Sequence, residues 1–267
     1  ESARLYDHSI KLYEGLTREL NFNVMFSQRG VVSLAHSRHD LDNITQWANA
    51  MQLNGVDSAM LSRDELQALM PRLNMAEGAR YPILGGFIQR RAGTARHDAV
   101  AWGYARAADQ LGVDIIQNCE VLDYIWSGER IVGVKTSRGD IGAGKIGVAV
   151  AGHTSVLAQK AGLRLPIESH VLQAFVTEGL KPVIDSVISF GMGHFYVSQS
   201  DKGGLVFGGD IDGYNSYAQR GNLPVVEDVA EGGMSLMPMI GRARLLRMWG
   251  GVMDMSMDGS PIIDKTH

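Results

Sequence analysis

The sequence is short of features that mark several classes of protein. It contains one cysteine, Cys119, so no disulfide can form within the chain, and a reducing, cytoplasmic setting fits best. We predict that Cys119 is buried and inert, because a free cysteine packs as a small hydrophobic side chain. No apolar run approaches the roughly 20 residues that cross a bilayer, so we expect no membrane partner.

An excess of positive charge is also missing. The chain has 25 Lys and Arg against 29 Asp and Glu, which gives a net charge of −4, and its basic residues form no dominant tract. Nucleic acids bind to clustered positive surface, so we expect no nucleic-acid partner. A hydrophobic fraction of 45% and a charged fraction of 20% are typical of a globular protein that can bury a sizeable core.

Apolar spacing predicts several helices. Leu5, Leu12, Leu16 and Leu20 recur at helical spacing and predict a helix over residues 3–20 with one buried face. Further helices are predicted from Asp40 to Gly55, from Ser62 to Pro71, from Asp98 to Gly112, from 154 to Gly162 and over 224–237. Ser62 and Glu65 form a capping box, and Asp98 stands where a helix N-cap is expected.

Short apolar runs between turn residues predict strands for most of the remaining chain. The fold class is therefore α+β, a mixed α/β chain. Residues 127–130 and 201–204 predict hairpins, and Gly139-Asp140 predicts a turn. The predicted strands are 24–35, 85–91, 113–117, 121–126, 131–136, 145–150, 167–177, 187–190, 194–199, 205–209 and 245–253.

Two groups of residues imitate binding motifs. Residues 142–147 fit the pattern G-x-G-x-x-G, and Glu168 follows about 20 residues later. We interpret this match as chance, because it leads into a predicted strand, whereas the dinucleotide motif opens a helix. His36 and His39 have no third metal ligand at suitable spacing, so we predict solvated loop histidines and no metal site.

Three arginines precede His97. Arg90, Arg91 and Arg96 favour a solvated surface, with an anion site or a subunit contact as the alternative, because guanidinium groups suit phosphate. His97 by itself fits a helix cap or a surface residue. Composition and spacing alone lead no further than a globular α/β or α+β chain.

The string over residues 93–104, GTARHDAVAWGY, resembles the flavin-attachment segment of the β-subunit family of heterotetrameric sarcosine oxidases. Residues 21–36, 113–121, 194–209 and 249–264 are similar to the same family, so the resemblance extends over essentially the whole chain. The string over residues 93–104 is specific to this β-subunit family. The strand-rich parts are shared with the wider D-amino-acid oxidase-like superfamily of FAD-dependent oxidoreductases, which includes glycine and monomeric sarcosine oxidases.

The resemblance implies two flavins. His97 occupies the place of the histidine that carries FMN covalently, and Thr94, Ala95 and Arg96 would line that FMN site. A non-covalent FAD would contact Val121, Ala151 and Gly152. Tyr196 is a candidate for the substrate face, although an ordinary packed tyrosine is an equal alternative.

The resemblance also implies an activity and partners. The expected reaction is oxidative demethylation of sarcosine to glycine, with formaldehyde or methylene-tetrahydrofolate and hydrogen peroxide as the other products. The expected partners are α, γ and δ subunits, which would hold any tetrahydrofolate and NAD. The alternatives are a flavin oxidase or dehydrogenase acting on dimethylglycine or a D-amino acid, and a non-catalytic fragment.

The same resemblance implies a division of the chain. Residues 1–20, 81–165 and 250–267 would belong to an FAD-binding domain, and residues 21–80 and 166–249 to a substrate domain on a mixed, largely antiparallel sheet. The family's Gly-rich nucleotide turn has no counterpart here, and the chain starts without Met. We therefore expect an internal fragment of a longer subunit that is inactive alone.

Overall fold

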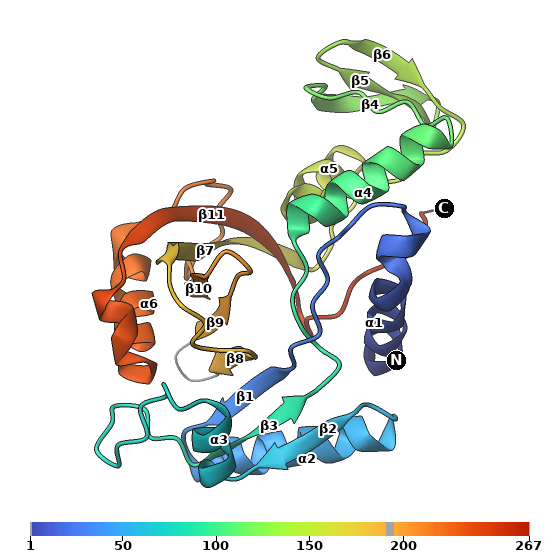
Figure 1. Ribbon diagram of the computed structural model, residues 1–267. Helices are drawn as coiled ribbons and strands as arrows, with labels where there is room; N and C mark the ends of the chain where they lie inside the picture. Colours follow the sequence, from blue (N-terminus) through green and yellow to red (C-terminus); the bar gives the residue numbers. More distant parts are fainter. Residues whose placement is uncertain (1, 191–194, 267) are drawn as a thin grey trace.

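A large mixed sheet forms the centre of the computed structural model, which describes residues 2–190 and 195–266 (Figure 1). Its strand order is β11-β7-β10-β9-β8-β1-β3-β2. Only β1 and β8 pair in parallel within this described sheet, so the expected mixed and largely antiparallel sheet is confirmed. The strands are β1 (Val31–Ala35), β2 (Ser58–Leu61), β3 (Gly85–Gln89), β7 (Ile167–Gly179), β8 (Val187–Phe190), β9 (Phe195–Gln199), β10 (Gly204–Ile211) and β11 (Leu245–Ser256).

One face of this sheet carries the main core. Alternate residues of β9 and β10, among them Phe195 and Phe207, pack against helix α6 (Leu223–Leu236) and the short helix η2 (Pro238–Arg242). The Asn222 side chain caps α6 by accepting a hydrogen bond from Val225 N at 3.1 Å. The helix predicted over 224–237 is therefore confirmed to within a residue. His194, the predicted first residue of β9, lies outside the described residues.

Two helices lie at the β2 end of the sheet. In α3 (Arg63–Leu69), the predicted capping box is confirmed, since Ser62 and Glu65 bond each other's backbone amides. Helix α2 (Arg38–Leu53) has a second capping box, formed by Ser37 and Asp40, and buries Ile44 and Ala48 against the sheet. Gly55, with a φ of +79°, follows the end of α2, as predicted.

A smaller layer stands away from the large sheet (Figure 1). It consists of the three-stranded sheet β4 (Val121–Ser127), β5 (Arg130–Thr136) and β6 (Gly139–Gly142), with α4 (His97–Gln110) and α5 (Thr154–Lys160) nearby. The short helix η1 (Ala151–His153) instead contacts β11 and β7 of the large sheet. The hairpin predicted at 127–130 is confirmed. Helix α1 (Ser2–Glu19) is also confirmed, but only Leu16 and Leu20 of its predicted stripe are buried, while Leu5 and Leu12 are exposed.

Several predicted elements were wrong. Residues 113–117 and 145–150 form no strand, and within the described chain they find no strand partner to satisfy their backbone groups. The strand predicted over 24–35 is shortened to β1. Residues 24–30 are not part of it, because Met25 and Gly30 have positive φ values of 53° and 77°, which extended strands do not allow. Gly139-Asp140 begins β6 instead of forming a turn, and Arg96 takes the N-cap position predicted for Asp98.

The predicted division into two domains remains a prediction. Strand β3, which the prediction assigns to the FAD-binding part, pairs with β1 and β2 inside the large sheet. Strand β11 also continues through residue 250 without a break. No described helix is both long enough and apolar enough to cross a membrane.

Candidate functional site

Residues 92–97, here called the attachment segment, are held by backbone hydrogen bonds to the chain that precedes β1. Ser27 and Thr94 bond each other in both directions, at 2.8 and 3.0 Å, and Gly30 N donates to Ala92 O at 2.8 Å. A Cβ atom on Gly93 would overlap the carbonyl oxygen of Ser27. Glycine is therefore required at position 93, because the two backbones approach too closely for any side chain.

His97 is the first residue of α4, and its side chain is exposed. The guanidinium group of Arg96 donates two hydrogen bonds to the Asp98 carboxylate, from Nε to Oδ1 at 3.1 Å and from Nη2 to Oδ2 at 2.7 Å. These bonds from Arg96 lower the pKa of Asp98. The imidazole of His97 has no hydrogen-bond partner among the described residues. A ring nitrogen with an available lone pair can act as a nucleophile, and no described neighbour blocks the ring.

Each of the three arginines near His97 has a carboxylate of this chain as its partner. Arg90 forms an ion pair with Asp57 at 2.8 Å, Arg91 forms one with Glu14 at 2.6 Å, and Arg96 forms one with Asp98. The hydrogen bonds from Arg91, together with that from Gln28, lower the pKa of Glu14. The structure therefore pairs these cations within the chain, which fits the interpretation of a solvated surface better than a bare anion site.

Tyr196 lies on the sheet face opposite the α6 core, because its neighbours Phe195 and Val197 both point into that core. The strand register aligns it with a row of small residues: Ser33, Ser189, Gly208 and Ala174. Its hydroxyl lies 2.9 Å from the place where a Cβ on Gly208 would be, so the ring lies across β10. Burial raises the pKa of Tyr196. The hydroxyl has no hydrogen-bond partner among the described residues.

The three residues expected near FAD have different surroundings. Ala151 is exposed, with a φ of +45°, and Val121 is exposed at the start of β4. Gly152 is buried, and a Cβ there would overlap Val252 of β11. The structure therefore explains the small residue at position 152 by close packing against β11.

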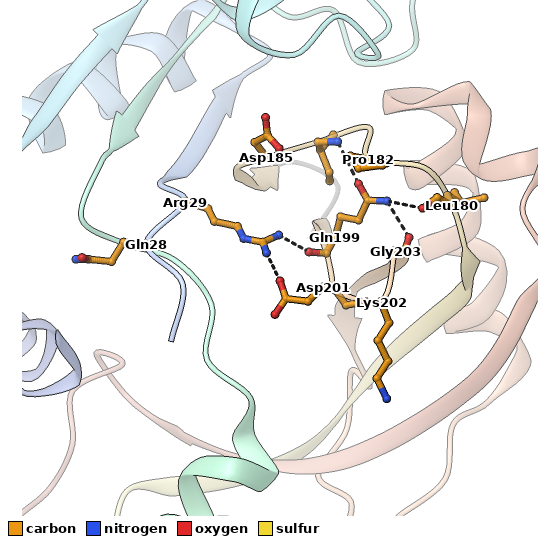
Figure 2. Close-up of a pocket in the computed structure, with 11 residues that line it drawn as sticks. Gln28, Arg29, Leu180, Pro182, Asp185, Gln199, Asp201, Lys202 and Gly203 are labelled. Carbon is orange, nitrogen blue, oxygen red and sulfur yellow. Dashed lines mark hydrogen bonds and ion pairs between the residues drawn. The ribbon is translucent and has the colours of Figure 1, made fainter. Parts of the chain in front are cut away.

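Sequence reasoning missed a cavity of about 680 Å³ (Figure 2). It lies between the residues before β1, the β7–β8 connection and the β9–β10 hairpin. Arg29 crosses toward the hairpin and donates to Gln199 O at 2.8 Å, to the Asp201 carboxylate and to Ser27 Oγ at 2.9 Å. No local pattern marks Arg29, because its partners at positions 199 and 201 are distant in sequence.

Two other predictions were wrong. His36 is buried, not solvated: its ring packs against Phe190 with ring centres 4.2 Å apart, and its Nδ1 lies 3.2 Å from Pro82 O. Cys119 is partly exposed instead of buried. The described residues contain no cluster of His, Cys, Asp or Glu that could hold a metal ion, and residues 142–147 open no helix.

A solved structure shows the fold, and a matching family shows the class of protein. The chain resembles the crystal structure of L-proline dehydrogenase from P. horikoshii, with a TM-score of 0.89 at 22% identity over 99% of this chain and 70% of that one. The family described as FAD dependent oxidoreductase matches residues 1–267. The chain belongs to this family, which confirms the family expected from the sequence.

Two curated relatives show which members of the family this chain is most similar to in sequence among those compared. The chain is 63% identical to sarcosine oxidase subunit beta from Rhizobium meliloti over 261 residues, which are 98% of this chain and 62% of the relative. It is 50% identical to the subunit of the same name from Rhodobacter capsulatus over 265 residues, 99% of this chain and 64% of the relative. The expected resemblance is therefore confirmed, and the chain spans a little under two thirds of these relatives.

Proposed function

We propose that this chain is the flavin-carrying part of a sarcosine oxidase β subunit. The observation that carries the proposal is the exposed, unbonded imidazole of His97 at the first position of α4, inside a segment whose path Gly93 fixes. The identity of 63% to a sarcosine oxidase subunit beta supports the assignment of substrate.

The residues around His97 fit a covalent FMN. A neutral ring nitrogen of His97 would bond to the C8-methyl carbon of the flavin while a C–H bond of that methyl group breaks. The proton would leave to solvent, the flavin would take up the electron pair, and oxygen would reoxidise it. Thr94, Ala95 and Arg96 would line the FMN site. Thr94 and Ala95 are half-buried, and Arg96 is held beside His97 by its bonds to Asp98. The exposure of His97 suits a cofactor that lies where this subunit meets an α subunit.

The proposed non-covalent FAD would contact Val121, Ala151 and Gly152. Once bound, FAD would accept the electrons of the N-methyl carbon, and FMN would pass them to oxygen. The protein would orient the substrate between FAD and the large sheet. Tyr196 suits the substrate face because it lies on the sheet face opposite the α6 core, and its free hydroxyl lies beside small residues.

The proposed net reaction converts sarcosine, oxygen and water to glycine, formaldehyde and hydrogen peroxide. The one-carbon unit would pass to tetrahydrofolate where another subunit supplies that site. The proposed partners are the α, γ and δ subunits, of which one could also hold NAD. A cytoplasmic location is part of the same proposal.

The test is peptide mass spectrometry of the complete assembly. We expect the flavin mass on the peptide that contains His97, and its loss in the variant His97→Ala. His39→Ala is the matched control, because His39 is also an exposed histidine close to the start of a helix, α2, and it should keep the flavin. Flavin on another peptide, or retained by His97→Ala, would remove the assignment.

A second measurement tests the substrate. The assembly should oxidise sarcosine faster than dimethylglycine or D-alanine at equal concentration, with peroxide as the readout. Faster turnover of either competitor would favour the alternative of a related flavin oxidase or dehydrogenase.

A further inference from the structure

Residues 27–29 join three parts of the molecule that are far apart in sequence. We propose that Arg29 is a positioning residue: it fixes the attachment segment against the β9–β10 hairpin, and so sets where a flavin on His97 lies relative to the Tyr196 face. This inference rests on the proposed function, because it concerns the flavin that His97 would carry.

The first contact is between residues 27–30 and the attachment segment. The backbone bonds of Ser27 with Thr94 fix the register, because a shift by one residue would bring a side chain against the Ser27 carbonyl, where only Gly93 fits. The side chain of Gln28 adds a bond to Arg91 O at 2.8 Å and another to Glu14 of α1, also at 2.8 Å. A shift of residues 27–29 would therefore move the attachment segment with it.

The second contact is between Arg29 and the hairpin. The guanidinium group donates through Nε to Ser27 Oγ, through Nη1 to Gln199 O and through Nη2 to Asp201, as Figure 2 shows for the last two. The side chain is only 27% exposed, so it is held more firmly than a typical surface arginine. Three acceptors in different directions match the planar fork of arginine, and a lysine ammonium on its flexible stem cannot reach all of them.

The hairpin in turn is rigid and carries the substrate face. The buried side chain of Gln199 accepts from Val183 N at 2.8 Å and donates to Lys181 O at 3.0 Å and Gly203 O at 2.8 Å. The bonds to Val183 and Lys181 tie the hairpin to the β7–β8 connection, and the bond to Gly203 lies within the hairpin. Tyr196 precedes Gln199 on β9, and Gly208 lies opposite Tyr196 on β10. Arg29 thus connects the backbone beside His97 to the strands that carry the row of small residues.

The experiment uses the complete assembly with Arg29→Ala, Arg29→Lys and the control Arg90→Ala. Arg90 also precedes the attachment segment and also pairs with an aspartate, but its partner Asp57 lies outside the hairpin. The readouts are the fraction of His97 that carries flavin, by mass spectrometry, the visible circular dichroism of the flavin, and kcat and KM for sarcosine. The midpoint of thermal unfolding reports on folding.

We expect Arg29→Ala to lower the flavin-bearing fraction or kcat by about tenfold, because small misplacements of reacting groups have large effects on rate. The flavin dichroism should change, and KM should change less than kcat. Arg29→Lys should fall between Arg29→Ala and the wild type, and Arg90→Ala should match the wild type.

Wild-type flavin content, dichroism and kcat in Arg29→Ala would overturn the proposal, as would an equal loss in Arg90→Ala. If Arg29→Ala does not fold, Arg29→Lys decides, and wild-type behaviour there would overturn it. A wild-type assembly without flavin on His97 would instead refute the proposed function, so the two failures are distinguishable.

Discussion

His36 shows how strongly burial alters a single side chain. Its ring is enclosed by Phe190 and Tyr81, and its Nε2 has no hydrogen-bond partner in the described structure. Burial lowers the pKa of His36 below the ordinary value of 6.5. The folded protein therefore disfavours the charged imidazolium, for which this apolar site offers little solvation.

The consequence is a loss of stability in acid. The unfolded chain takes up the proton near pH 6.5, and the folded chain only at lower pH, so the contribution of His36 is complete above about pH 6.5 and is lost as the pH falls toward the lowered value. We expect the free energy of unfolding in urea to fall between pH 7.5 and 5.5, and to fall less in His36→Leu. An equal fall in both proteins would contradict this reasoning.

Gly93 shows how one missing side chain fixes the path of the candidate site. We expect Gly93→Ala to lower the free energy of unfolding by about 1–3 kcal/mol, because the added methyl group has to displace backbone. Gly15→Ala is the matched control: nothing lies within 4 Å of a Cβ there, and alanine in a helix should stabilise by about 0.5–1 kcal/mol. Urea unfolding measures both changes, and a neutral Gly93→Ala would show that the two backbones can separate freely.

At the scale of elements, the helices with strong start signals formed where the sequence placed them. The capping box at Ser62 and the caps at Ser37 and Asn222 each satisfy amides that would otherwise lack partners. Helix α4 begins without a side-chain cap at its N-cap residue. The Asp98 carboxylate accepts hydrogen bonds from the Arg96 side chain and from the backbone amide of Ala99. The start of α4 is therefore shaped by the attachment segment more than by local capping.

The capping interpretation can be tested on α3. Ser62→Ala should lower the free energy of unfolding by about 1 kcal/mol, because the Glu65 amide loses its acceptor. Ser9→Ala, on the exposed part of α1, serves as the control and should stay within about 0.5 kcal/mol of the wild type. Chemical denaturation provides the comparison, and equal stability of Ser62→Ala and Ser9→Ala would show that the cap contributes nothing.

At the scale of the whole molecule, the candidate groups are distributed over two layers. His97 lies at the start of α4 and Val121 at the start of β4 in the small sheet, whereas Tyr196 lies on the large sheet (Figure 1). Gly152 packs against β11 of the large sheet. The glycine-containing residues 142–147 do not open a helix, so the described part holds no Gly-rich turn of the dinucleotide type there.

We therefore expect the 267-residue chain by itself to bind FAD weakly and not to oxidise sarcosine. The measurement is the visible absorbance of the purified chain after incubation with FAD and desalting, followed by a peroxide assay with sarcosine. The complete assembly is the positive control. A yellow chain that produces peroxide steadily would overturn this expectation.

The sequence by itself determined the elements whose signals are local: the capped helices, the hairpin at 127–130 and the alternating strands from residue 167 onward. It also carried the attachment string, from which His97 was identified as the flavin candidate. These features depend on side chains and turns within a few residues of one another, so a linear pattern records them.

Only the tertiary structure decided which apolar runs became strands and which residues meet. Residues 113–117 and 145–150 have strand-like sequences, but a strand needs a partner, and pairing is not local. Likewise, Ser27 meets Thr94 and Arg29 meets Asp201 across long separations in sequence. Such contacts arise when the sheet assembles, because burial of its core fixes the register and brings distant backbones together.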